Sequence, residues 1–131
     1  MAANTIPIVP IAPIVGIGDT IATLTSRNKI TGTTGLTAVT ATSTNGLRID
    51  QVVVQLAANS AAAIVFLWIY DGTTSFLFDE LPIPAVTATT TVPAARVAKS
   101  YTNLILPPTY RLYATTTVAQ NTDTYALGGS Y

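Results

Sequence analysis

Hydrophobic residues follow a strand-like pattern in the stretch Ala61–Leu81, whose sequence is AAAIVFLWIYDGTTSFLFDEL. An apolar run rich in β-branched and aromatic residues leads into Asp71–Gly72, a dipeptide typical of hairpin turns, and a second apolar run follows. The pattern predicts a β-hairpin. Side chains of a strand alternate between faces, so Trp68 lies on one face and Leu67 on the other. Both faces are apolar, so the face that would normally meet water needs a cover, either another part of the chain or another subunit.

The first 18 residues show a different pattern, with prolines at positions 7, 10 and 13 separated by Ile, Val and Ala. Each proline fixes its own φ and disfavours helix for the residue before it, which predicts an extended arm similar to polyproline II. A signal peptide would need a basic start, and a membrane span would need a longer apolar run without prolines. We therefore divide the chain into a Pro-rich arm over 1–18 and a folded domain over 19–131.

Two interpretations of the arm remain open. It forms an edge strand on its own domain, or it lies on a neighbouring subunit. We favour the second, because isoleucines are costly to leave in water and cannot join a sheet centre beside three prolines. The residues predicted to contact the partner are Ile6, Pro7, Ile8, Pro10, Ile11, Pro13 and Ile14.

The rest of the chain shows short apolar runs separated by Gly, Pro and Asn. Besides the hairpin, the expected strands are Thr20–Thr25, Leu36–Thr42, Leu47–Ala57, Lys99–Leu106, Tyr110–Val118 and Asp123–Tyr131. In Leu47–Ala57, the face that points inward is expected to switch near Val52–Val54. Ala85–Ala95 is expected to be a long loop. Lys99–Leu106 and Tyr110–Val118 are predicted to pair as a hairpin around two prolines. About eight strands indicate an all-β antiparallel β-sandwich, jelly-roll or Ig-like, with a barrel less favoured.

Composition strengthens the expectation of a protein that associates with others. Charged residues make up 9% of the chain, far below the roughly 25% that is typical. Six basic residues balance six acidic ones, so repulsion does not keep copies apart. The six basic residues form no cluster, which argues against binding nucleic acid.

Candidate chemistry is sparse. The chain has no Cys and no His, so the usual metal ligands and the usual catalytic base are missing. Asp79 and Glu80 are neighbours on an expected strand and would face opposite sides, so they cannot converge on one substrate atom. Asp71 is expected to serve the hairpin turn. Trp68 and the tyrosines are interpreted as core or interface residues, with a glycan-stacking platform as the alternative. We predict no enzyme, and no catalytic, cofactor or metal site.

The C-terminal half carries a resemblance. The order YDGTTSFLFDE, LPIPA, a Thr/Ala-rich stretch, NLILPPTYRLYATTT and a short ending in GGSY is similar to small structural proteins of tailed bacteriophages and prophages. In that family a Leu-Pro-x-Gly-Trp-like turn precedes a strand of the L-x-A-[ST]-T type, and the chain stops soon after a Gly-Gly-x-aromatic ending. Here Thr109 and Tyr110 stand where Gly and Trp are more familiar. The resemblance covers about Gly46–Tyr131 and leaves out the arm.

The resemblance implies a β-sandwich virion component. The expected function is that of a capsid decoration, or cement, protein on the capsid surface, which clamps neighbouring capsid subunits through its sandwich and its arm. Its partners would be the major capsid protein or another virion protein and further copies of itself, as a homo-oligomer, with no nucleic acid and no membrane. The alternative is a tail- or fibre-associated module that binds a receptor or glycan.

Overall fold

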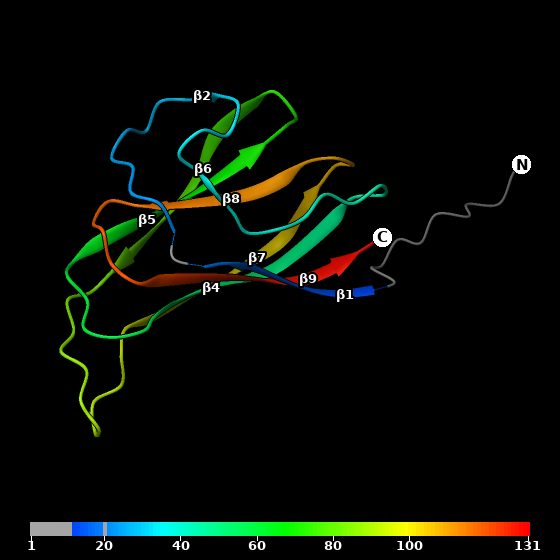
Figure 1. Cartoon of the computed structure of the whole chain (residues 1–131). Helices are drawn as coiled ribbons and strands as arrows, with labels where there is room; N and C mark the ends of the chain where they lie inside the picture. Colours follow the sequence, from blue (N-terminus) through cyan, green and yellow to red (C-terminus); the bar gives the residue numbers. More distant parts are fainter. Residues whose placement is uncertain (1–11, 20) are drawn as a thin grey trace, which may run out of the picture.

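The computed structural model describes residues 12–19 and 21–131, with side chains from Gly16 onward. The described chain is an all-β sandwich, as predicted, built from two antiparallel sheets (Figure 1). Its strands are β1 (Ala12–Gly18), β2 (Ile30–Thr31), β3 (Thr37–Ala38), β4 (Leu47–Leu56), β5 (Ala63–Tyr70), β6 (Thr74–Ile83), β7 (Arg96–Leu106), β8 (Arg111–Thr116) and β9 (Thr122–Ser130). Sheet A has the order β1-β9-β4-β7, and sheet B has the order β2-β6-β5-β8-β3.

The predicted hairpin is confirmed as β5 and β6, which pair antiparallel from Ala63 with Ile83 to Tyr70 with Ser75. Asp71 forms the turn as expected: its Oδ1 accepts hydrogen bonds from the backbone N–H groups of Thr73 and Thr74 at 2.9 and 2.8 Å. Gly72 has φ +102°, a conformation that glycine adopts without a Cβ penalty. These N–H groups hold the pKa of Asp71 below its ordinary value.

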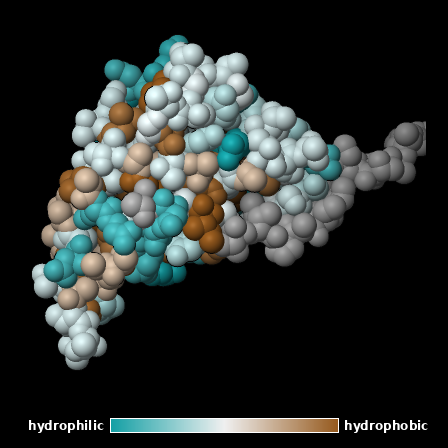
Figure 2. All heavy atoms as spheres, in the orientation of Figure 1, coloured by the Kyte–Doolittle hydropathy of each residue, from teal (hydrophilic) through white to brown (hydrophobic). Residues whose placement is uncertain are grey.

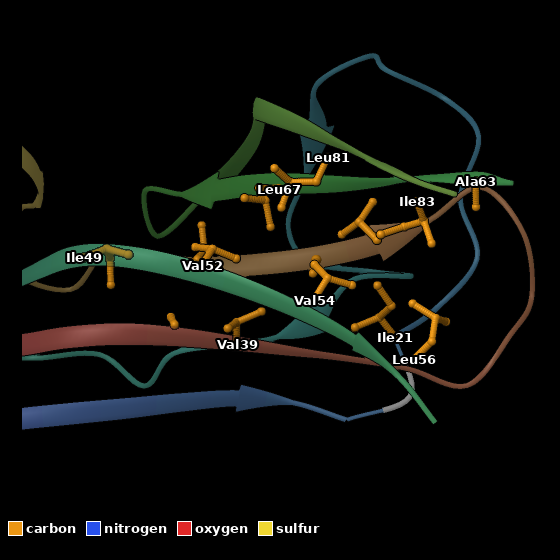
Figure 3. Packing of buried hydrophobic residues seen from close by; sticks show 14 of the residues in the cluster. Ile21, Val39, Ile49, Val52, Val54, Leu56, Ala63, Leu67, Leu81 and Ile83 are labelled. Carbon is orange, nitrogen blue, oxygen red and sulfur yellow. The ribbon is translucent and has the colours of Figure 1, made fainter. Parts of the chain in front are cut away.

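The main core lies between the two sheets (Figure 3). Strand β4 contributes Leu47 and Ile49 and then, after a bulge between Ile49 and Gln51, the even-numbered Val52, Val54 and Leu56. One extra residue moves every later side chain to the other face. The predicted change of face is therefore confirmed, and the bulge that causes it lies just before Val52.

The second face of β5 is covered by another part of the same chain, which resolves the choice left open by the sequence. Phe66 and Trp68, both fully buried, pack with Tyr113 under side chains from the segment 21–38, among them Leu24, Ile30 and Leu36. This segment is fixed by backbone hydrogen bonds to β8, including Leu24 N–H to the Thr116 carbonyl at 2.9 Å. The hairpin therefore does not need a neighbouring subunit to bury its two faces.

The predicted hairpin of Lys99–Leu106 with Tyr110–Val118 is wrong. Both stretches are strands, but β7 pairs with β4 in sheet A, and β8 pairs with β5 and β3 in sheet B. Between them Pro107 and Pro108 have no N–H for a ladder, and Thr109 adopts φ +72°. The Tyr110 N–H closes the turn on the Pro107 carbonyl at 3.1 Å. The chain uses this turn to cross from one sheet to the other.

Two other predicted strands are shorter than expected. In the stretch Thr20–Thr25, the described residues 21–25 contribute an isolated bridge at Thr23. The stretch Leu36–Thr42 contributes only β3. Residues 84–95 form the expected loop between β6 and β7, which projects from one end of the sandwich (Figure 1). Ser60 anchors the base of this loop through hydrogen bonds to Pro84 and Val86.

The arm predicted over 1–18 falls in two parts. Ala12–Gly18 forms β1, an edge strand of sheet A that pairs with β9 of the same chain. Cβ atoms on Gly16 and Gly18 would crowd the backbone of Ala38–Val39, so glycine lets β1 approach this neighbouring segment closely. The edge-strand interpretation thus describes residues 12–18, and residues 1–11 lie outside the described structure.

Candidate interaction surface

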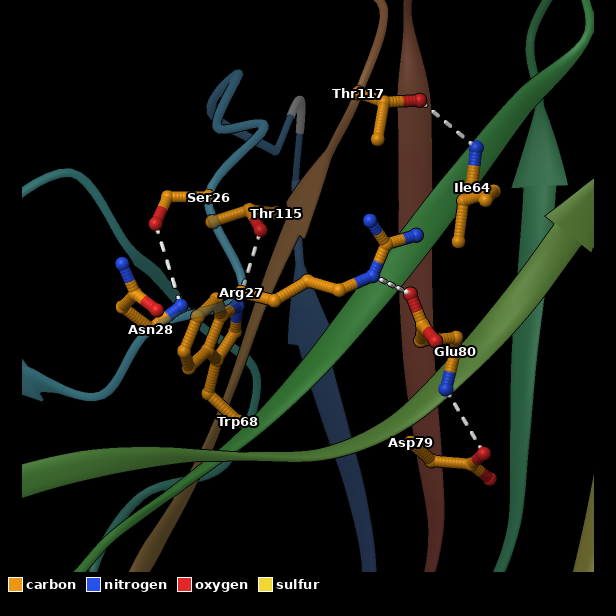
Figure 4. Close-up of polar contacts among 9 residues, drawn as sticks. All are labelled: Ser26, Arg27, Asn28, Ile64, Trp68, Asp79, Glu80, Thr115 and Thr117. Atoms are coloured by element: carbon orange, nitrogen blue, oxygen red, sulfur yellow. Dashed lines mark hydrogen bonds and ion pairs between the residues drawn. The ribbon is translucent and has the colours of Figure 1, made fainter.

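The two adjacent carboxylates, Asp79 and Glu80, face opposite sides of β6, as predicted. Glu80 Oε1 lies 2.6 Å from Arg27 Nε, and the Arg27 guanidinium lies over the ring of Phe66 at 5.0 Å from its centroid. Figure 4 shows Arg27 reaching from its loop to Glu80, with the Asp79 carboxylate turned away. Glu80 therefore helps to hold the segment 21–38 over sheet B, and Asp79 is directed elsewhere.

Asp79 joins β6 of sheet B to β7 of sheet A. Its Oδ2 lies 2.6 Å from Lys99 Nζ and accepts a hydrogen bond from the Tyr101 hydroxyl at 2.7 Å. Burial acts to raise the pKa of Asp79, but the bonds from Lys99 and Tyr101 outweigh it and leave the pKa below its ordinary value. Burial and the neighbouring carboxylate raise the pKa of Tyr101. This cluster has the properties of a clamp between the sheets, with every polar partner engaged.

The aromatic residues divide between core and surface in a way that the sequence does not reveal. Trp68 is fully buried, and its Nε1–H donates to Thr115 Oγ1 at 3.0 Å. Each of the six tyrosines is half-buried or buried. Instead, Phe76 and Phe78 on β6 are 46% and 39% exposed. The interpretation of Trp68 as a core residue is confirmed, so it is not a platform for a glycan.

The outer face of sheet A has no other strand packed against it among the described residues (Figure 1). Directly paired residues place their side chains on the same face, and one such set crosses all four strands. We call it the outer row: Ile17 on β1, Tyr125 on β9, Val53 on β4 and Ala98 on β7. Ile17 is 55% exposed and Val53 only 5%, so exposure differs strongly along the row.

The residues beside the outer row are also uncharged over the middle of the sheet. The next set along the strands is Leu127, Gln51 and Ser100. Charged side chains lie toward the two ends of the sheet, with Asp123 and Arg96 at one end and Arg48 at the other. This surface has little signature in the sequence, because Tyr125 and Leu127 point outward while the smaller Thr124 and Ala126 of β9 are the buried residues.

A groove of about 460 Å³ lies beside the middle of β1, the start of β4 and the end of β9. Its lining residues are Gly16, Thr40, Ala41, Thr42, Ser43, Thr44, Leu47 and Ser130. The volume is within the range of small-ligand clefts, but the lining carries no charged side chain and no strong nucleophile. Figure 2 shows mostly pale residues of intermediate hydropathy around smaller teal and brown clusters. The surface in this view is therefore weakly polar and poorly charged.

The structure describes only two of the seven predicted partner-contact residues. Pro13 and Ile14 lie in β1, where they pair with Gly129 and Gly128, and Ile6, Pro7, Ile8, Pro10 and Ile11 lie outside the described residues. Across 12–19 and 21–131, acidic side chains form no group of three that could hold a metal ion. The described part of the chain has no helix suited to crossing a membrane. Searches of family models, curated proteins and solved structures gave no match to this chain.

Proposed function

We propose that this protein is a non-enzymatic structural component of a virion, a capsid decoration or cement protein that clamps neighbouring capsid subunits. The observation that carries the proposal is the attachment of an apolar, Pro-rich segment to an edge strand of a weakly charged sandwich. Residues 1–11 are joined to the body at Ala12, the first residue of β1. Four of the seven residues from Thr5 to Ile11 are Ile or Val, and burying them against a partner would be favourable.

The sandwich supplies a rigid body for this segment. Its two sheets, the cover over sheet B and the Asp79 clamp are all formed within one chain, so it would bind as a preformed module. Its charged side chains include three intramolecular ion pairs, Arg27–Glu80, Arg48–Asp50 and Lys99–Asp79. Contact with another protein would then leave few charges without partners. The glycan-binding alternative is less supported, because Trp68 is buried.

The first test asks whether the protein belongs to a particle. Virions or prophage particles purified from the host that encodes the chain should contain it at a fixed ratio to the major capsid protein, with antibody labelling on the head. Absence from purified particles, or labelling on the tail alone, would overturn the proposal.

The second test asks whether residues 1–11 make the contact. Shells stripped of the chain are mixed with the full-length protein, with a variant lacking 1–11, and with a variant in which Ile6, Ile8 and Ile11 are replaced by Thr. Deletion stops at residue 11 because removing β1 would expose the edge of β9. Both variants should keep the thermal midpoint of the sandwich and bind shells at least tenfold more weakly. Equal binding by all three would remove the arm from the mechanism.

A further inference from the structure

We propose that the outer row is a self-association surface, on which two copies of the chain pack sheet A against sheet A about a two-fold axis parallel to the strands. The inference concerns the homo-oligomer that the proposed function includes, and it names the face. It is tested on the purified chain alone, so a failure of shell binding and a failure of self-association are separate results. Three features of this face indicate that its partner is a second copy of the chain: the sizes of the side chains in the outer row, the charges around it and its area.

The outer row is complementary to its own reversed image. Its two larger side chains, Ile17 and Tyr125, lie on β1 and β9, and its two smaller ones, Val53 and Ala98, lie on β4 and β7. A two-fold axis along the strands, between β9 and β4, reverses this order in the second copy. Ile17, which is 55% exposed, then lies opposite the short Ala98. Tyr125 lies opposite Val53, which is 5% exposed. Large side chains therefore lie opposite small ones, as close packing between sheets requires.

Charges on the face are compatible with the same arrangement. The middle of the face carries no charged side chain in the outer row or in the neighbouring set of Leu127, Gln51 and Ser100, so pairing would bury no ion there. At one end, Asp123 on β9 and Arg96 on β7 flank Gln55. The two-fold axis places Arg96 of each copy diagonally across from Asp123 of the other. Opposite charges at the rim favour this register over its alternatives.

The available area fits a dimer that dissociates on dilution. Four strands at about 4.8 Å spacing and seven residues at about 3.4 Å rise cover on the order of 450 Å² per copy. Two copies would bury about 900 Å² or somewhat more once side-chain relief is included, at the lower end of specific interfaces. The outer face of sheet B differs, because side chains from the segment 21–38 already pack on its centre.

The first experiment measures mass against concentration by analytical ultracentrifugation. The full-length chain should pass from 13.6 kDa toward twice that mass as concentration rises. Ile17→Glu should raise the dimer dissociation constant at least tenfold, since it places a carboxylate against Ala98 of the other copy. Val92→Glu is the matched control: Val92 is 44% exposed but lies on the loop 84–95, so this variant should dimerise normally. A chain that stays monomeric up to about 1 mM, or an Ile17→Glu variant that dimerises normally, would overturn the proposal.

The second experiment tests the geometry. The chain has no cysteine, so introduced thiols are unique. In the Ile17→Cys/Ala98→Cys variant the two thiols of one copy are three strands apart. Across the two-fold axis, the thiol at position 17 of one copy faces the thiol at position 98 of the other copy. A short bis-maleimide should therefore give covalent dimers, and each single-cysteine variant should give far fewer. A control with Ile17→Cys/Val92→Cys should remain monomeric. Equal yields from the Ala98→Cys single variant and the double variant would reject this axis.

Discussion

The hydrogen bond between Trp68 and Thr115 offers a sharp test of how the second hydrophobic cluster is stabilised. Both side chains are fully buried, and the Nε1–Oγ1 distance is 3.0 Å. Thr115→Val keeps the shape of the side chain and removes the acceptor of the indole N–H. A buried donor without a partner costs about 1–3 kcal/mol, and the extra apolar contact of Val offsets part of this. We expect a net loss of about 1.5 kcal/mol, or about 5 °C in thermal midpoint for a chain of this size.

Urea unfolding followed by fluorescence measures this loss directly, because Trp68 is the single tryptophan. Thr102→Val, at an exposed position of β7, is the matched control and should change stability by less than about 0.5 kcal/mol. A double-mutant cycle with Trp68→Phe, followed by circular dichroism, isolates the pair. When Trp68→Phe is already present, Thr115→Val should cost almost nothing. If Thr115→Val cost the same in both backgrounds, or cost under about 0.5 kcal/mol in the native one, the hydrogen bond would not be what stabilises this cluster.

Two further predictions concern the clamp and the sheet. Asp79 and Asp71 have pKa values lowered in the fold, below the ordinary 3.8. The stability that these carboxylates contribute is therefore complete above that pH and is lost as pH falls through the folded-state pKa values. Acid unfolding of Asp79→Asn should show a shallower loss of stability below pH 3.8 than the native chain, and an identical slope would contradict the assignment. A Cβ on Gly128 would overlap the Arg48 carbonyl oxygen, so Gly128→Ala should lower the free energy of unfolding by about 3 kcal/mol or more. Gly35→Ala is the control and should lower it by about 1 kcal/mol, because only the positive φ is strained there. Equal losses in urea titrations would show that β9 can move away from β4.

Local signals predicted the parts of the fold that local chemistry determines. The Asp71–Gly72 turn and the alternation beside it indicated the β5–β6 hairpin, and the Val52–Val54 run indicated the change of face in β4. The pairing of β7 and β8 could not be predicted in this way. Their closeness in sequence favoured a hairpin, but the two prolines and Thr109 turn the chain across the sandwich, and only the full set of strand partners shows this.

The segment 21–38 was missed for a different reason. Leu24 and Leu36 were expected in the strands Thr20–Thr25 and Leu36–Thr42, but the segment forms only the short strands β2 and β3. Its covering side chains, among them Ile30, follow no continuous strand or helix period that would indicate a cover. Similarly, on β9 the larger side chains of Tyr125 and Leu127 point outward. Hydrophobicity alone favours burying the larger side chains, but the space left inside by the rest of the core accepts the smaller Ala126. The candidate surface therefore depends on strand register, which the sequence did not reveal.

Because the segment 21–38 covers sheet B, the β5–β6 hairpin is not the part of the chain that needs a partner. The two apolar faces of β5 suggested that the hairpin itself required a neighbour, and the chain meets that requirement alone. Two apolar parts of the chain remain that could contact a partner, the Pro-rich segment before Ala12 and the outer row. They are joined through β1, because Ile17 belongs to the strand that begins where residues 1–11 end. A second copy seated on one side of β1 would therefore stiffen the point from which the arm leaves. Self-association through sheet A would in this way fix the positions of two arms relative to each other, and two linked arms would bind a shell more tightly than either arm alone.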